Sequence, residues 1–202
     1  EKWMRERNYF GLMMVNTGEA DAMVTGHSRS YPSTIKPVMQ LIDKAPGVSK
    51  IATTNMMMTA RGPIFLSDTA INPNPSADDL ARIALMTAKT VRMFGMEPVI
   101  AMVSYSNFGS SNNEGPSKVS QAVAYLHENF PDLIVDGEIQ TDFALNSEML
   151  KSKFPFSKLV NKKVNTLIFP NLDAANITYK LLKELNKAES IGPIILGLDK
   201  PV

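Results

Sequence analysis

The sequence contains no cysteine and only two histidines, His27 and His127. Disulfides, thiolate zinc sites and a cysteine nucleophile are therefore excluded, and we expect no multi-histidine metal site. The 21 basic and 20 acidic residues nearly cancel, so the chain lacks the basic excess that bulk electrostatic binding of nucleic acid needs. No apolar run approaches the roughly 20 residues of a membrane-spanning helix. These absences predict a cytoplasmic protein that binds neither nucleic acid nor membrane and holds no metal.

What is present is typical of a globular protein, with 202 residues of which 44% are hydrophobic and 20% charged. The chain begins with Glu1 and has no initiator Met or signal-peptide segment. It ends soon after a strand-like apolar run at 191–196. We therefore expect the chain to be a piece of a longer polypeptide.

Strand-like and helix-like segments alternate along the chain, which favours an α/β fold built on a largely parallel sheet covered by helices. Apolar runs and hydrophobic periodicity predict strands over 21–25, 50–58, 63–66, 99–103, 133–135, 166–169 and 191–196. The same criteria predict helices over 33–43, 76–94, 116–129, 143–151 and 175–186. Ser33 and Ser76 are the expected N-caps of the first two helices. The turn at Arg61-Gly62 predicts a hairpin at the edge of the sheet.

Ligands of open parallel sheets lie beyond the carboxyl ends of the strands, so the loops at those ends are the candidate sites. The strand over 99–103 leads into a loop rich in hydroxyls, amides and glycine, which suits phosphate binding through uncharged donors. Its candidate ligand contacts are Ser104, Ser106, Asn107, Gly109 and Ser110. The alternative is a plain hydrophilic loop, and composition alone favours that alternative.

Two further segments carry candidate groups. The strand over 166–169 leads to Asn171, Asp173 and Asn176, where a helix cap and free N–H groups form a second anion site. The polar segment from His27 to Ser30 follows the first predicted strand and is a third candidate.

Three carboxylates, Asp136, Glu138 and Asp142, follow the strand over 133–135. Three acids so close together suggest a metal site or acid–base chemistry. No histidine stands beside them and the spacing is not that of a calcium loop. We therefore favour a structural role, in which the carboxylates accept hydrogen bonds from loop N–H groups.

Five segments, taken in order, resemble the phosphate acetyl/butyryltransferase family: 65–75, 104–110, 132–140, 167–180 and 191–202. The resemblance implies a three-layer sandwich of the isocitrate/isopropylmalate dehydrogenase type, with two α/β subdomains flanking a cleft. Residues 1–46 would be the C-terminal part of a first subdomain that is incomplete in this chain, 47–190 the second subdomain, and 191–202 a strand returning towards the first. Lys36 lies where free enzymes of the family carry an arginine, so it joins Ser30 among the candidate ligand contacts.

Within that family, 106–110 and 171–177 look like the phosphotransacetylase-like C-terminal region of bacterial NADP-dependent malic enzymes. This implies a regulatory domain that binds acetyl-CoA as an effector and forms homo-oligomers. Malic enzyme domains N-terminal to it in the same polypeptide would convert malate to pyruvate and CO2 with NADP and a divalent metal, Mg or Mn. The alternatives are an active phosphate acetyltransferase, which transfers acetyl between acetyl phosphate and CoA, and a dimerisation module with an empty cleft. The family's Ser-Arg-Gly catalytic segment would follow Val202, so no catalytic residue is assigned.

Overall fold

The computed structural model describes residues 3–26, 29–185 and 187–202. It divides into two compact units. The first comprises the described residues up to Ile51 together with Gly197–Val202, and the second comprises Ala52–Leu196. The boundary near residue 46 and the return segment 191–202 that the sequence suggests as subdomain limits stay a prediction.

The first unit contains a short 3-10 helix, η1 (Trp3–Arg5), and two α-helices, α1 (Arg7–Thr17) and α2 (Tyr31–Leu41). The Glu6 carboxylate accepts hydrogen bonds from the backbone N–H groups of Asn8 and Tyr9 and so caps α1. The helices bury Leu12, Val15 and Val38. Residues 197–202 are tied to this unit by backbone hydrogen bonds of 2.9 Å from Ala45 N to Gly197 O and from Asp199 N to Asp43 O.

Two predictions in this unit are wrong, and one helix was missed. Residues 21–25 form no strand. Met23 N donates a backbone hydrogen bond to Pro201 O, but this bond is not part of a ladder between two strands. An apolar run becomes a strand only where a neighbouring strand pairs with it. Helix α1 was not predicted. Ser33 is not an N-cap, because α2 begins two residues earlier with Ser30 at the N-cap position and a proline in its first turn.

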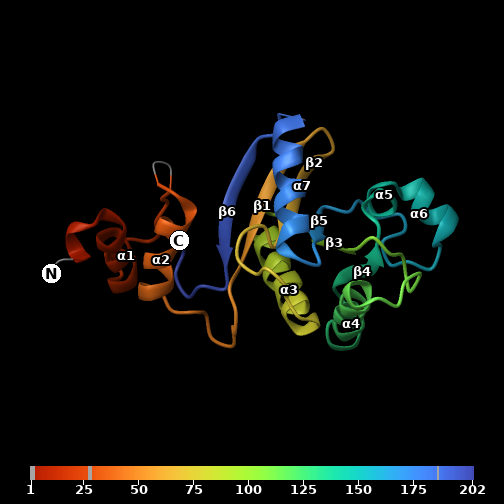
Figure 1. The fold of residues 1–202 in the computed structure, drawn as a ribbon, viewed down its shortest axis with the longest axis horizontal. Helices are drawn as coiled ribbons and strands as arrows, with labels where there is room; N and C mark the ends of the chain where they lie inside the picture. Colours follow the sequence, from red (N-terminus) through yellow and green to blue (C-terminus); the bar gives the residue numbers. More distant parts are fainter. Residues whose placement is uncertain (1–2, 27–28, 186) are drawn as a thin grey trace. The chain divides into compact units, whose positions relative to one another are not determined.

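The second unit is built on a six-stranded sheet in the order β4-β3-β5-β2-β1-β6 (Figure 1). The strands are β1 (Ala52–Thr59), β2 (Gly62–Ser67), β3 (Val99–Val103), β4 (Ile134–Ile139), β5 (Thr166–Ile168) and β6 (Ser190–Leu196). Strands β2, β5, β3 and β4 pair in parallel, whereas β1 is antiparallel to both of its neighbours. The sheet is therefore mixed, with a parallel majority as predicted.

Helices cover both faces of this sheet. They are α3 (Ala77–Met93), α4 (Glu114–Asn129), α5 (Thr141–Leu145), α6 (Ser147–Lys153) and α7 (Leu172–Leu185). Ile100 and Met102 of β3 pack in one core with α3 and α4. The alternate residues of β3 pack in a second core with α5, α6 and α7. Side chains of a strand point alternately to its two faces, so this division confirms the three-layer α/β fold.

Local signals placed most elements of this unit correctly. Ser76 caps α3 in a reciprocal pair with Asp79, as the sequence predicts. The β1–β2 hairpin is not at the sheet edge, because β6 pairs with β1 on its outer side. The predicted helix over 143–151 is two short helices, α5 and α6, divided at Asn146. Among the described helices, none combines the length and the apolar character needed to cross a membrane.

Candidate functional site

The carboxyl ends of β3 and β5 lie side by side, because these strands pair in parallel. A pocket of about 240 Å³ opens there. It is lined by residues from the loops after β2, β3 and β5 and from the start of α4, namely Asn74, Ser104, Tyr105, Glu114, Gly115, Lys118, Pro170 and Asn171. We call it the Lys118 pocket.

Lys118 provides the positive charge of this pocket. Its Nζ donates hydrogen bonds to Asn74 Oδ1 at 2.7 Å and to the carbonyl oxygen of Pro170 at 3.0 Å. Burial lowers the pKa of Lys118 below its ordinary value, and the nearby negative charge of Glu114 acts in the opposite sense. An ammonium group has three donors, so one N–H of Lys118 is left for a ligand.

Two of the predicted contacts, Ser104 and Asn171, line this pocket. Asn171 Oδ1 also accepts a 2.9 Å hydrogen bond from Ala174 N, which caps α7. The other predicted residues on α7 lie elsewhere: Asn176 Nδ2 donates to Thr69 O at 3.0 Å, and Asp173 is exposed. The structure therefore brings together one residue from each of the two predicted loops.

The remaining residues of the first predicted loop hold the loop itself together. Ser106 is 1% exposed and its hydroxyl bonds to Glu138 and to Ser110. Asn107 exchanges hydrogen bonds with Gln140, donating to its Oε1 and accepting from its N–H. Ser110 Oγ accepts from the Asn107 N–H at 2.9 Å, and Gly109 lines a second pocket.

Tyr105 also belongs to this loop and is 60% exposed. Its hydroxyl bonds to Ser111 Oγ and accepts from Asn113 Nδ2. These hydrogen bonds lower the pKa of Tyr105 below its ordinary value. The loop is thus held in a defined conformation on the rim of the Lys118 pocket.

Ser30 and Lys36 lie in the first unit. Ser30 occupies the N-cap position of α2, and its hydroxyl donates to Ser33 Oγ at 3.1 Å. Lys36 is an exposed residue within α2. His27 and Ser28, which belong to the same predicted site, lie outside the described residues.

The acidic segment is placed differently from the prediction, because Asp136 and Glu138 are part of β4 and both are buried. Their predicted structural role is confirmed. Asp136 Oδ2 accepts from Ser157 Oγ and Lys158 N, both at 2.8 Å. Glu138 Oε1 accepts from Gly109 N at 2.6 Å. The described residues include no group of three or more metal-ligating side chains placed to hold an ion.

Sequence reasoning missed Lys118, Asn74 and Tyr105 as pocket residues. A lysine one turn into the helix that follows a polar loop was a usable signal for Lys118, because that position lies near the carboxyl end of the preceding strand. Asn74 had no such signal, since it comes from the loop after β2 and is distant in sequence from the other lining residues.

A family model described as phosphate acetyl/butaryl transferase matches residues 1–202. The chain belongs to this transferase family. It is similar to the phosphate acetyltransferase of Acetivibrio thermocellus, with 41% identity over 96% of this chain and 60% of that protein. It is also similar to the NADP-dependent malic enzyme of Escherichia coli, with 39% identity over 95% of this chain and 25% of that protein.

A solved phosphotransacetylase from Streptococcus pyogenes has the same fold, with a TM-score of 0.91 and 39% identity over all of this chain and 61% of that structure. The chain thus spans less than two thirds of the length of these transferase-family relatives. The predicted family is confirmed. The identities to the acetyltransferase and to the malic enzyme are nearly equal, so they do not favour the malic-enzyme branch.

Proposed function

We propose that the chain is part of a phosphate acyltransferase that transfers an acetyl group between acetyl phosphate and CoA. The observation that carries this proposal is the match of all 202 residues to the transferase family. In the reaction the CoA sulfur attacks the carbonyl carbon of acetyl phosphate. A C–S bond forms, and the bond between that carbon and the bridging phosphate oxygen breaks. The thiol proton is lost and inorganic phosphate leaves.

Both substrates carry phosphate groups, and the Lys118 pocket has features that suit such a group. Lys118 offers an N–H that is not used by Asn74 or Pro170. Ser104 adds a hydroxyl, and Gly115 lies in the first turn of α4, where the helix dipole favours an anion. Glu114 on the same turn partly offsets this charge, which limits the site to a weakly held group.

The sequence-based malic-enzyme interpretation supplies a second candidate. Under it the chain would bind acetyl-CoA as an effector and form oligomers, and the N-terminal part of the same polypeptide would hold NADP and Mg or Mn. The similarity to the Escherichia coli malic enzyme is compatible with this second candidate, whereas the similarity to named phosphate acetyltransferases favours acetyl transfer. We therefore prefer acetyl transfer as the proposed function.

An assay of the whole protein that carries residues 1–202 separates the two. Acetyl-CoA formation from acetyl phosphate and CoA is followed by thioester absorbance, and malate oxidation is followed by NADPH formation. We expect thioester formation that saturates in both substrates. Malate-dependent NADPH formation without any acetyl transfer would contradict the proposal and leave the second candidate.

A substitution tests the role of the pocket within this function. We expect Lys118→Gln to raise the KM for acetyl phosphate or CoA about tenfold, because it removes a charge-assisted hydrogen bond. Lys89→Gln is the matched control, since Lys89 is an exposed lysine on α3. Equal KM values for the two variants would show that Lys118 does not bind either substrate. The proposed transfer reaction would not be contradicted by that result.

A further inference from the structure

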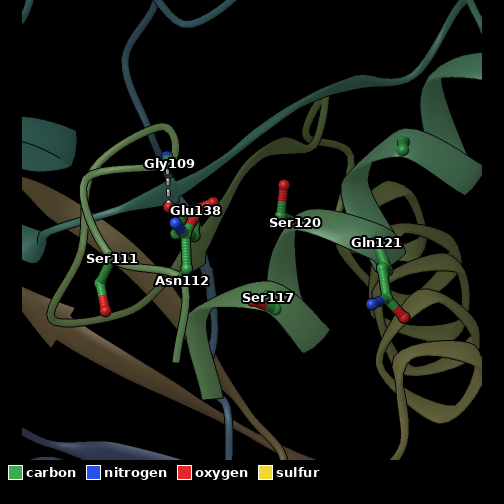
Figure 2. Close-up of a pocket in the computed structure, with 8 residues that line it drawn as sticks. Gly109, Ser111, Asn112, Ser117, Ser120, Gln121 and Glu138 are labelled. Carbon is green, nitrogen blue, oxygen red and sulfur yellow. Dashed lines mark hydrogen bonds between the residues drawn. The ribbon is translucent and has the colours of Figure 1, made fainter. Parts of the chain in front are cut away.

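A second pocket, of about 310 Å³, lies between the loop after β3 and the side of α4. Figure 2 shows Gly109, Ser111, Asn112 and Glu138 on one side of it and three polar residues of α4 on the other. The complete lining is Gly109, Ser111, Asn112, Ser117, Ser120, Gln121, Ala124 and Glu138. We call it the Glu138 pocket.

The Glu138 carboxylate is unusual in how its two oxygens are used. The residue is 1% exposed. Oε1 accepts hydrogen bonds from Ser106 Oγ at 2.9 Å and from Gly109 N at 2.6 Å. Oε2 is buried and has no hydrogen-bond partner among the described residues. A buried carboxylate oxygen without a donor carries a large desolvation cost, so Oε2 favours a ligand that brings a donor which the described residues do not supply.

The chemistry of the lining indicates which donor fits. Of the described residues that line the pocket, Glu138 alone is ionisable, and the polar remainder are serines and amides. The pocket therefore has a negative charge, and none of the described residues on its wall is a lysine, arginine or histidine that could balance it. An anion is disfavoured there, and an N–H donor with positive charge is favoured, because a charge-assisted hydrogen bond is about twice as strong as a neutral one.

We propose that the Glu138 pocket binds the primary ammonium group of a small polar amine, with N–H donation to Glu138 Oε2. The hydroxyls and amides of Ser117, Ser120 and Gln121 are placed to bind further polar groups of the same molecule. The volume exceeds the space that one water or one ammonium ion occupies, which favours an amine that carries hydroxyl or amide groups.

This site is separate from the one used in the proposed function. Ser117, Ser120 and Gln121 lie on one face of α4, whereas Glu114, Gly115 and Lys118 lie on the neighbouring face. The loop after β3 is shared, because Ser104 and Tyr105 line one pocket and Gly109 and Ser111 the other. Amine binding in the Glu138 pocket does not depend on acetyl transfer, so a binding measurement alone tests it.

Calorimetry on the whole protein tests the site with a matched pair of probes, serinol and glycerol. Serinol has an ammonium group where glycerol has its central hydroxyl, so the pair differs only at the group that should meet Glu138. We expect serinol to bind with a dissociation constant of roughly millimolar size and at least about tenfold more tightly than glycerol. Equal affinities, or no saturable binding of serinol, would overturn the proposal.

Two further cationic probes separate hydrogen bonding from charge. Methylammonium donates N–H bonds, whereas tetramethylammonium carries the same charge without a donor. We expect only methylammonium to compete with serinol. Competition by tetramethylammonium to the same degree would show a general attraction for cations and contradict a donor site.

Two variants locate the binding. Glu138→Gln turns the unpartnered oxygen into an N–H donor, so serinol affinity should fall to that of glycerol. Because Glu138 also holds the loop, a second variant keeps it: Ser120→Lys places an ammonium group on the α4 wall and should weaken serinol binding at least about tenfold. Ser152→Lys, on an exposed position of α6, adds the same charge elsewhere and is the control. Unchanged affinity in Ser120→Lys would place any observed binding outside this pocket.

Discussion

The turn after β2 and the loop after β3 each close around a buried carboxylate, and the two carboxylates are used in opposite ways. Asp68, 4% exposed, has both oxygens occupied. Oδ1 accepts from Thr53 N at 3.0 Å and from its hydroxyl at 2.5 Å, as well as from two backbone N–H groups of the turn. Oδ2 accepts from the N–H and the side-chain amide of Asn72.

Glu138 is buried to a similar extent, but the described residues donate to one of its oxygens only. Four of Asp68's donors come from residues 70–72, immediately after it in the chain. The donors of Glu138 come from Ser106 and Gly109, about thirty residues earlier in the sequence. Burial by itself therefore does not distinguish a carboxylate that is fully structural from one that has an oxygen available, whereas the count of donors on each oxygen does.

The largest expected effect comes from Asp68→Asn. Both oxygens of Asp68 accept hydrogen bonds, so the NH2 group of asparagine would replace one acceptor and point at N–H or O–H donors. Those hydrogen bonds would be lost and their donors would be buried without an acceptor. We expect the free energy of unfolding to fall by about 3 kcal/mol in urea denaturation. Asp142→Asn, at an exposed position, is the control. A loss below about 1 kcal/mol would mean that the Asp68 network contributes no more than an ordinary surface contact.

Removal of one donor from Glu138 should have an intermediate effect. Ser106→Ala takes a donor from Glu138 Oε1 and the acceptor of the Ser111 N–H. We expect a loss of about 1.5 kcal/mol in the same denaturation measurement, together with faster hydrogen exchange at Ser111. Ser120→Ala on the exposed side of α4 should change stability by less than about 0.5 kcal/mol. Equal losses in the two serine variants would refute the role assigned to Ser106.

Glu138→Gln should cost less than Asp68→Asn, although both replace a buried carboxylate by its amide. The glutamine oxygen keeps the acceptor for Ser106 and Gly109, and the new NH2 takes the position that has no donor against it. We expect a change in unfolding free energy of less than about 1 kcal/mol. If this variant lost as much stability as Asp68→Asn, the difference between the two carboxylates would disappear.

The smallest effect concerns pH. Burial lowers the pKa of Lys118 below its ordinary 10.5, so between the two pKa values the folded protein binds fewer protons than the unfolded chain. The free-energy cost of burying the charged Lys118 is therefore present at neutral pH, and it disappears as pH rises through the folded-state pKa towards 10.5. Relative to Lys118→Gln, the parent protein should gain stability over this range in urea titrations. A difference that stays constant with pH would contradict a desolvated lysine.

Much of the second unit could be predicted from the sequence because its signals are local. The Ser76–Asp79 cap and the apolar run of β3 depend on residues a few positions apart. The first unit was predicted less well: residues 21–25 have a strand-like composition, yet no strand pairs with them. Ser104 and Asn171 line the same pocket because parallel strands bring their carboxyl ends to one edge of the sheet. That part of the site follows from topology.

The sequence by itself determined the family, the three-layer α/β class and the loops that carry polar groups. Only the tertiary structure decided that Lys118 joins Ser104 and Asn171. It also decided that Glu138 lies within β4, with one oxygen that receives no hydrogen bond from the described part of the chain. The physical reason is the range of the interactions involved. Capping and periodicity act within a turn or two of chain, whereas the donors that reach a buried carboxylate or line a pocket come from segments that only the packed sheet brings together.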